Sequence, residues 1–185
     1  MRKLIPVAAL ALVAIGGEVS SAQTASTMSF RPSLYAGAAI PTGDIGNSLN
    51  TGFTVGGGLD LHTGPSPLSW RGEVSYTRYN AKDDGSGTTG NFSDFSGRVN
   101  AVLGMPATGF APYLIGGVGI YHLSASETNS GFTLSTSDNK FGWNIGAGVD
   151  MPIGDIAGRL EVRYNSVSED GGNYTYVPIT FGIRF

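Results

Sequence analysis

The chain has 185 residues, no cysteine, and 11 basic against 14 acidic residues, which gives a net charge of −3 at neutral pH. The absence of cysteine excludes disulfides and thiolate metal sites. A weakly acidic chain has no basic stripe to neutralise phosphates, so we expect no nucleic acid as a partner. The length is suited to one domain.

The first residues have the pattern of a secretory signal peptide. Two basic residues precede an apolar run at 4–15, and small residues before Ala22 suit cleavage after that position. The run is shorter than the roughly 18 residues that a spanning helix needs. We therefore expect residues 1–22 to be removed, residues 23–32 to form an N-terminal periplasmic segment, and residues 33–185 to form the folded domain.

Period-2 segments bounded by turn residues predict eight strands. Most of them approach the roughly 9 to 11 residues that a tilted strand needs to cross a bilayer. The predicted strands are 33–40, 53–62, 69–79, 92–103, 111–123, 140–151, 158–167 and 174–185.

The connections between these strands alternate in length. The connections at 41–52, 80–91 and 124–139 are long and rich in Gly, Ser, Thr and Asn, and 168–173 is a shorter connection of the same kind. The connections at 63–68, 104–110 and 152–157 are short, and each contains proline. This alternation predicts an all-β fold, an eight-stranded antiparallel up-and-down transmembrane β-barrel with its long loops outside the cell.

Charged residues share one parity within the strands. In 92–103, for example, Asp94 and Arg98 alternate with Phe95 and Val99. An Arg or Lys on the lipid face at the bilayer midplane would cost roughly 2 to 4 kcal/mol, so the charged parity must face the lumen. We expect a lumen charge network of Asp60, Arg71, Glu73, Asp94, Arg98, Lys140, Asp150, Arg159, Glu161, Arg163 and Arg184.

An eight-stranded barrel is only wide enough for side chains to fill its interior. The charged groups should therefore pair and plug the lumen, and a narrow gated ion path is the alternative function for the same residues. The segment 111–123 is apolar on both parities, so its lumen and lipid faces stay unassigned.

Aromatic residues near the strand ends predict two girdles at the membrane interfaces. The outer girdle is expected to contain Tyr76, Tyr79, Phe92, Tyr121, Phe141, Trp143, Tyr164, Tyr174 and Tyr176. The periplasmic girdle is expected to contain Trp70, Phe110, Tyr113, Phe181 and Phe185.

The final segment carries the most specific pattern. Alternate residues from Val177 to Phe185 are apolar, opposite Thr180, Gly182 and Arg184. A strand that closes on a carboxyl-terminal phenylalanine is typical of outer-membrane barrels.

With these features the chain resembles the small eight-stranded outer-membrane barrels of the OmpA/OmpX and opacity-protein type. The segment Ala-Ile-Pro-Thr-Gly-Asp at 39–44, Ala-Pro-Tyr at 111–113 and the terminal strand at 178–185 carry the resemblance, together with the signal peptide. The resemblance implies that the barrel assembly machinery reads Phe185 as an assembly signal, and that the protein serves membrane integrity, adhesion or surface interaction. No peptidoglycan-binding domain is expected, because nothing follows Phe185.

We accordingly expect a monomer in the outer membrane of a Gram-negative cell, with no cofactor and no enzymatic activity. Its partners would be outer-membrane lipids, lipopolysaccharide and extracellular ligands that meet the loops at 41–52, 80–91 and 124–139.

One enzymatic alternative rests on His122 and Ser124. Lipid A deacylases are small barrels with a His-x-Ser pair, and Glu127 is a candidate for the acid that would orient the base. That family has Asn after the serine, where this chain has Ala125, so we favour an interfacial role for His122. His62 has no second histidine nearby to complete a zinc site. The acidic loop pairs at 83–84 and 169–170 lack the ligand number of a calcium loop.

Overall fold

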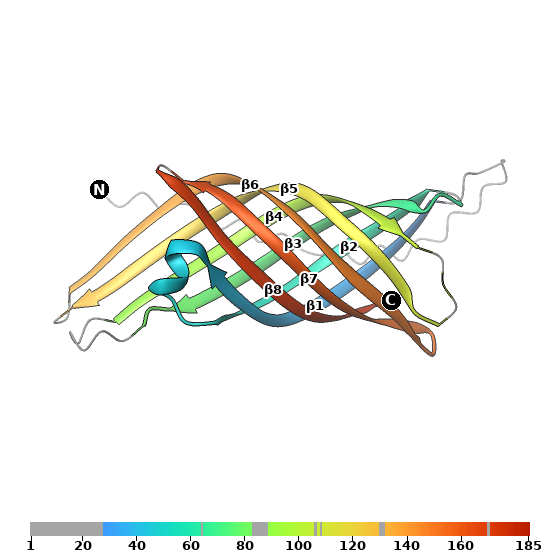
Figure 1. Cartoon of the computed structure of the whole chain (residues 1–185), viewed down its shortest axis with the longest axis horizontal. Helices are drawn as coiled ribbons and strands as arrows, with labels where there is room; N and C mark the ends of the chain where they lie inside the picture. The colour runs from blue at the N-terminus through green and yellow to red at the C-terminus, as the bar shows by residue number, and fades with distance from the viewer. Residues whose placement is uncertain are drawn as a thin grey trace, which may run out of the picture.

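The structure is a computed structural model that describes residues 28–63, 65–82, 89–105, 107, 109–129, 132–169 and 171–185. The chain forms a closed barrel of eight antiparallel strands, in which each strand pairs with its sequence neighbours and β1 pairs with β8. Figure 1 shows these strands wound obliquely around a common axis. The predicted eight-stranded antiparallel barrel is thus confirmed. Within the described residues, no helix has the length and apolar character to span a membrane.

The strands extend further than the sequence pattern predicts. They are β1 (Met28–Thr42), β2 (Gly52–Thr63), β3 (Leu68–Asn80), β4 (Thr89–Gly104), β5 (Ala111–Asn129), β6 (Phe132–Ile153), β7 (Ile156–Glu169) and β8 (Gly172–Arg184), with the 3-10 helix η1 (Gly43–Asn47) between β1 and β2. Strand β1 begins at Met28 and not at residue 33. The predicted long loop at 124–139 is wrong, because β5 and β6 continue their ladder through it as far as the pair Asn129 and Phe132.

The two ends of the barrel differ. At the end that we call the turn end, short links join β2 to β3, β4 to β5 and β6 to β7, and the C-terminus lies there as well (Figure 1). Gly154, with a φ of 63°, begins the two-residue link between β6 and β7, where a positive φ suits a tight hairpin. At the opposite end, the loop end, η1 follows β1 and the β5–β6 hairpin reaches furthest from the barrel.

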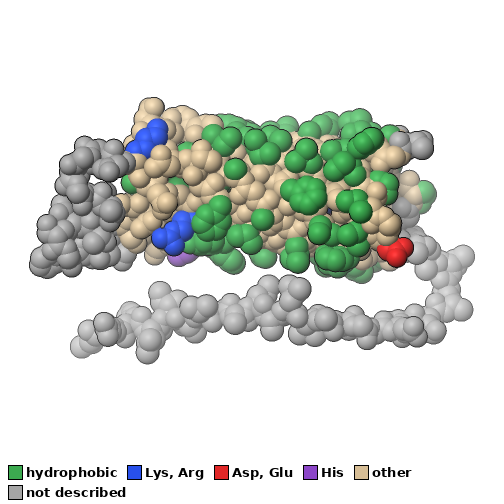
Figure 2. All heavy atoms as spheres, turned by 90° about the horizontal axis from the view of Figure 1, so that it is seen from below, with side chains coloured by type: hydrophobic (Ala, Val, Ile, Leu, Met, Phe, Trp, Pro, Cys, Tyr) green, Lys and Arg blue, Asp and Glu red, His purple; other side chains and the backbone are tan. Residues whose placement is uncertain are grey.

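Side chains alternate between an apolar outer face and a polar lumen. In β4, Phe95 and Val99 are exposed on the outside, whereas Asp94 and Arg98 are buried. Figure 2 shows hydrophobic side chains over the middle and the turn-end half of one face, with basic and histidine side chains towards the loop end. A broad apolar band of this kind is suited to hydrocarbon.

The structure also assigns the faces of β5. Leu114, Val118 and Ile120 are exposed on the outside, whereas Tyr113 and Tyr121 are buried inside. The strand is apolar on both parities because tyrosine rings and Gly117 and Gly119 occupy its lumen side.

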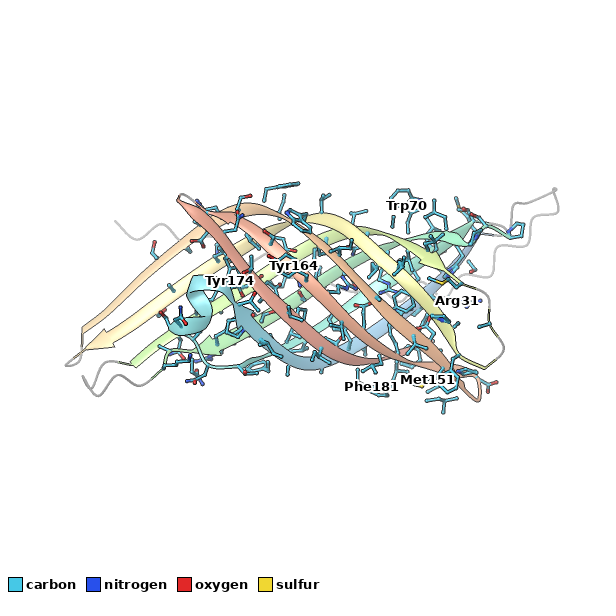
Figure 3. All side chains as sticks on the ribbon, in the orientation of Figure 1. Arg31, Trp70, Met151, Tyr164, Tyr174 and Phe181 are labelled. Carbon is cyan, nitrogen blue, oxygen red and sulfur yellow. The ribbon has the colours of Figure 1, made fainter. Side chains whose placement is uncertain are left out.

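The prediction of two complete aromatic girdles is partly wrong. Tyr164 and Trp143 do lie on the outer face, with ring centroids 5.7 Å apart, and Trp70 and Phe181 are exposed at the turn end (Figure 3). However, six of the predicted girdle residues share the lumen parity of their strands; they are Tyr79, Phe92, Tyr113, Tyr121, Tyr174 and Tyr176.

Several of these rings form an aromatic cluster inside the loop end. Tyr174 stacks on Tyr176 with centroids 5.0 Å apart, and Phe92 meets Tyr174 edge to face at 5.0 Å. Tyr79 contacts both tyrosines at 6.2 and 6.3 Å. Rings of this size pack inside the barrel because an eight-stranded lumen has about the width of facing side chains.

Candidate functional site

The lumen contains two connected groups of charged residues. The turn-end cluster consists of Asp60, Arg71, Asp150, Arg159 and Arg184. Arg71 Nε donates to Asp60 Oδ1 at 2.5 Å, and Arg159 Nη1 donates to Asp60 Oδ2 at 3.2 Å. Arg159 Nε donates to Asp150 Oδ1 at 2.8 Å, and Arg184 Nη1 lies 2.6 Å from Asp150 Oδ2. Five side chains from β2, β3, β6, β7 and β8 thus meet at one level of the barrel.

The central cluster lies next to it and consists of Glu73, Arg98, Glu161 and Arg163. Both Nη atoms of Arg163 donate to Glu73, at 2.5 and 2.7 Å, and its Nε donates to Glu161 at 2.5 Å. Arg98 Nε lies 4.0 Å from Glu73. Arg71 connects the two clusters, because its Nη1 donates to Glu161 Oε2 at 2.8 Å.

Neutral side chains complete these contacts, and the sequence analysis did not single them out as network members. Asn100 donates to Glu73 at 2.7 Å, and Tyr113 donates to Glu161 at 2.5 Å. Arg98 donates to the hydroxyls of Tyr35 and Ser75 at 2.9 and 3.0 Å. Their position on the same parity as the charged residues was the signal that could have identified them.

The clusters combine attraction with a large desolvation cost. Apart from the partly exposed Arg184, their charged side chains are buried, and each carboxylate is paired with at least one arginine. Buried ion pairs repay their desolvation cost only when geometry is good and the remaining polar atoms are bonded. The loss of one partner would therefore leave an uncompensated charge inside the barrel.

Two residues of the expected network lie outside these clusters. Asp94 is buried beside the aromatic cluster, near Arg98 and the hydroxyl of Tyr176, and no described basic side chain forms an ion pair with it. Lys140 pairs with Asp138 at 2.9 Å towards the loop end. Lys140 is displaced because β7 begins to pair with β6 only at Gly142, so that Lys140 lies beyond the closed ring.

The loop end carries what we call the projecting hairpin, which comprises residues 122–129 of β5 and 132–141 of β6. Strand β4 pairs with β5 as far as Thr128, so that edge of the hairpin is covered. In contrast, residues 132–141 of β6 pair with β5 but with no strand on their other side in the described part of the chain. About ten residues of strand edge are thus unpaired.

On β6, the described side chains of this hairpin from Thr136 to Lys140 are polar. Thr136, Ser137, Asp138 and Asn139 are all exposed, although successive residues point to opposite faces of a strand. Hydrogen bonds from Lys140 and from the backbone of Asn139 lower the pKa of the Asp138 carboxyl, so Asp138 is ionised at neutral pH. A segment that is polar on both faces belongs in water and not in hydrocarbon.

The residues of the enzymatic alternative are not arranged as a catalytic pair. His122 is exposed on the outer face, and its Nδ1 lies 2.9 Å from Asn139 Oδ1, while no described contact joins its ring to Ser124. The side chain of Glu127 and the acidic residues Asp83, Asp84 and Asp170 lie outside what the structure describes. Among the side chains that it does describe, no group of three His, Asp or Glu could hold a metal ion.

Comparison with known proteins places this barrel in a family. A family model, the outer membrane protein beta-barrel domain, matches residues 7–185. The chain belongs to this family. The predicted resemblance to small outer-membrane barrels is thereby confirmed, and the family points to the bacterial outer membrane. No curated protein matches the chain.

Three solved structures show the same fold. Neisserial surface protein A is 19% identical with a TM-score of 0.62, and the match covers 85% of this chain and 97% of that one. A major outer membrane protein from Thermus thermophilus is 15% identical with a TM-score of 0.58, covering 85% and 99%. Ail, the attachment invasion locus protein of Yersinia pestis, is 20% identical with a TM-score of 0.50, covering 85% and 98%.

Proposed function

We propose that this protein is a non-enzymatic outer-membrane barrel that binds an extended peptide segment of another protein at the cell surface. The unpaired edge of β6 on the projecting hairpin carries this proposal. An unpaired edge presents a row of N–H and C=O groups, and an extended peptide can add to it as a further strand. The surface protein and the attachment protein among the similar structures fit a surface role, although their likeness extends to the fold alone.

The composition of the hairpin supports binding in water. The exposed residues are polar on both faces, with Ser137 and Asn139 on one face and Asp138 on the other. We therefore expect the edge to stay in water and not to insert into hydrocarbon. The paired partner strand β5 holds the edge in an extended conformation before a ligand arrives. Such preorganisation reduces the ordering cost of association.

A plugged lumen is the second part of the proposal. The central cluster spans the interior from β3 and β4 to β7, and the cavity beside Arg98 and Arg163 has a volume of only about 10 Å³. A space of that size has room for about one water molecule. The ion pairs across the lumen therefore favour a closed, rigid barrel interior over an open channel.

A shortened hairpin tests the surface role. His122 and Asn139 are paired, so replacement of 123–138 by Asn-Gly keeps the register of the ladder and removes residues 132–138, which are most of the unpaired edge. We expect the purified wild-type barrel to bind a subset of extended peptides on a random peptide array, with new amide-exchange protection at 132–141, and the shortened variant to lose that binding. Equal peptide binding by both proteins would exclude the hairpin edge as the binding site.

A further inference from the structure

The lumen opens at the turn end into a cavity that the proposed surface role does not use. This turn-end cavity has a volume of about 460 Å³, a size that suits a small ligand. Four arginines line it, Arg31, Arg71, Arg159 and Arg184, together with Asp60, Asp150 and His62. Figure 3 shows Arg31 at the same end of the barrel as Trp70, Met151 and Phe181.

The two carboxylates in the cavity are already occupied. Asp60 accepts from Arg71 and Arg159, one on each oxygen. Asp150 accepts from Arg159 on both oxygens and pairs with Arg184. Arg71 also pairs with Glu161, so the four arginines face three carboxylates and the cavity keeps an excess of positive charge.

Some nitrogen atoms around the cavity, in contrast, have no hydrogen-bond partner. Arg71 is 1% exposed, and its buried Nη2 has no hydrogen-bond partner. The buried Nδ1 of His62 also has none. Arg31 is exposed at the mouth, and no described carboxylate pairs with it. A buried donor without an acceptor is costly, and an oxyanion in the cavity would supply the missing acceptor.

The geometry restricts access to one side. The central cluster lies between the cavity and the loop end, where Arg163 is bound to both Glu73 and Glu161. In outer-membrane barrels the short turns face the periplasm, so the cavity opens to that compartment. An adjoining hollow of about 510 Å³ is lined by Asp155 as well as Arg31 and Arg184, and it is therefore the less cationic of the two.

We propose that the turn-end cavity binds a small phosphate monoester from the periplasm. A dianionic phosphate group matches the excess of positive charge, and its oxygens can accept from the unpartnered Nη2 of Arg71. Arg31 at the mouth would close the ligand in from the periplasmic side. The ester substituent would occupy the remaining space near Tyr113 and Val102.

Titration in a phosphate-free detergent tests this site. The folded barrel in dodecyl maltoside would be titrated with glycerol 3-phosphate and with neutral glycerol, and followed by NMR of the His62 ring and the arginine Nε groups. We expect saturable shifts with glycerol 3-phosphate alone. The absence of saturable shifts at millimolar glycerol 3-phosphate, or equal shifts with glycerol, would overturn the proposal.

Two arginine variants then separate a site from general charge attraction. Arg31→Gln should weaken glycerol 3-phosphate binding about tenfold, which corresponds to about 1.4 kcal/mol for one lost charge-assisted contact. Arg78→Gln removes the same charge from an exposed residue on the outer face and should leave the affinity unchanged. Both residues are exposed, so both variants should fold. Equal affinities of the two variants would overturn the site.

Discussion

At the scale of single residues, the stability of the lumen depends on a few buried arginines. Arg71 lies 2.5 Å from Asp60, 2.8 Å from Glu161 and 3.8 Å from Glu73, so it serves three carboxylates at once. Its partner Glu161 is 90 residues away in the sequence. Arg71 is therefore the residue that holds the two clusters together.

Replacement of Arg71 by methionine should lower the free energy of unfolding by about 3 to 5 kcal/mol, because it leaves buried carboxylates without their partner. The measurement is urea unfolding of the barrel in lipid vesicles. The matched control is Arg78→Met, an exposed position where we expect a change within about 0.5 kcal/mol. Equal losses in the two variants would contradict the role given to the buried network.

A second prediction concerns Gly119, which lies on the lumen side of β5. A Cβ at Gly119 would lie 2.6 Å from both Cγ of Arg98 and the carbonyl oxygen of Gly97. Gly119→Ala should therefore destabilise the barrel by about 1 to 3 kcal/mol, as overpacking does. Gly97→Ala is the control, because nothing lies within 4 Å of its Cβ position. A larger loss of unfolding free energy for Gly97→Ala than for Gly119→Ala would refute this packing argument.

Parity in the sequence predicted a lumen position for all nine residues of the two clusters, but it did not predict which carboxylate each arginine contacts. Contacts such as Arg71 with Glu161 join strands on different sides of the ring, and they depend on the tilt and stagger of the strands. The same parity also predicts that Tyr79 and Tyr174 point into the lumen. They were assigned to the outer girdle because aromatic residues near strand ends are typical of membrane interfaces. Large aromatic rings can therefore lie in the lumen or at the membrane interface, and the parity of their position in the strand determines which.

At the scale of elements, β8 closes the barrel by pairing with both β7 and β1, and Phe185, which directly follows β8, is exposed on the apolar outer face. Family resemblance implies that this residue is read during assembly. We expect Phe185→Asp to reduce the amount of folded barrel in the outer membrane strongly, as measured by the heat-modifiable band on an unboiled gel. Phe110→Asp is the control, because Phe110 is an equally exposed aromatic residue at the turn end. Similar folded amounts of the two variants would show that Phe185 acts as an ordinary lipid-facing residue.

The projecting hairpin shows why element lengths were underestimated. Residues 124–139 are rich in Ser, Thr and Asn, a composition shared by loops and by strands that face water on both sides. Apart from Ala125, Phe132 and Leu134, these residues are polar or glycine, so the period-2 pattern that identified the other strands is too weak there to predict a strand. Continuation of the ladder between β5 and β6 supplied the hydrogen bonds that composition did not predict.

At the scale of the whole molecule, the proposal of a plugged lumen leads to a prediction about ion conductance. In planar bilayers the wild-type barrel should produce no long-lived, porin-like conductance steps, because paired side chains from β3, β4 and β7 cross the interior. Single-channel recording under symmetric salt is the measurement. Large and stable conductance steps would favour the ion-path alternative for the same residues.

The architecture itself was predictable because several independent patterns agree. Strand number, alternation of connection length and the polar parity each indicate an eight-stranded barrel, and closure then requires a neighbour for every strand. The turn-end cavity was not predictable, because Arg31 and His62 carry no recognisable spacing. They come together only when β1 and β2 pair at the mouth of the closed ring.

Pairing of β1 with β8 has a consequence for biogenesis. Leu34 is the partner of Ile183, so the two edges of the sheet meet only after nearly all of the chain is available. Contacts between such distant segments form slowly, since a long loop must be closed before they stabilise anything. Until then the sheet has two unpaired edge strands, and these can pair with other copies of the chain. The transit time between export and ring closure is therefore the period in which this protein most needs a chaperone.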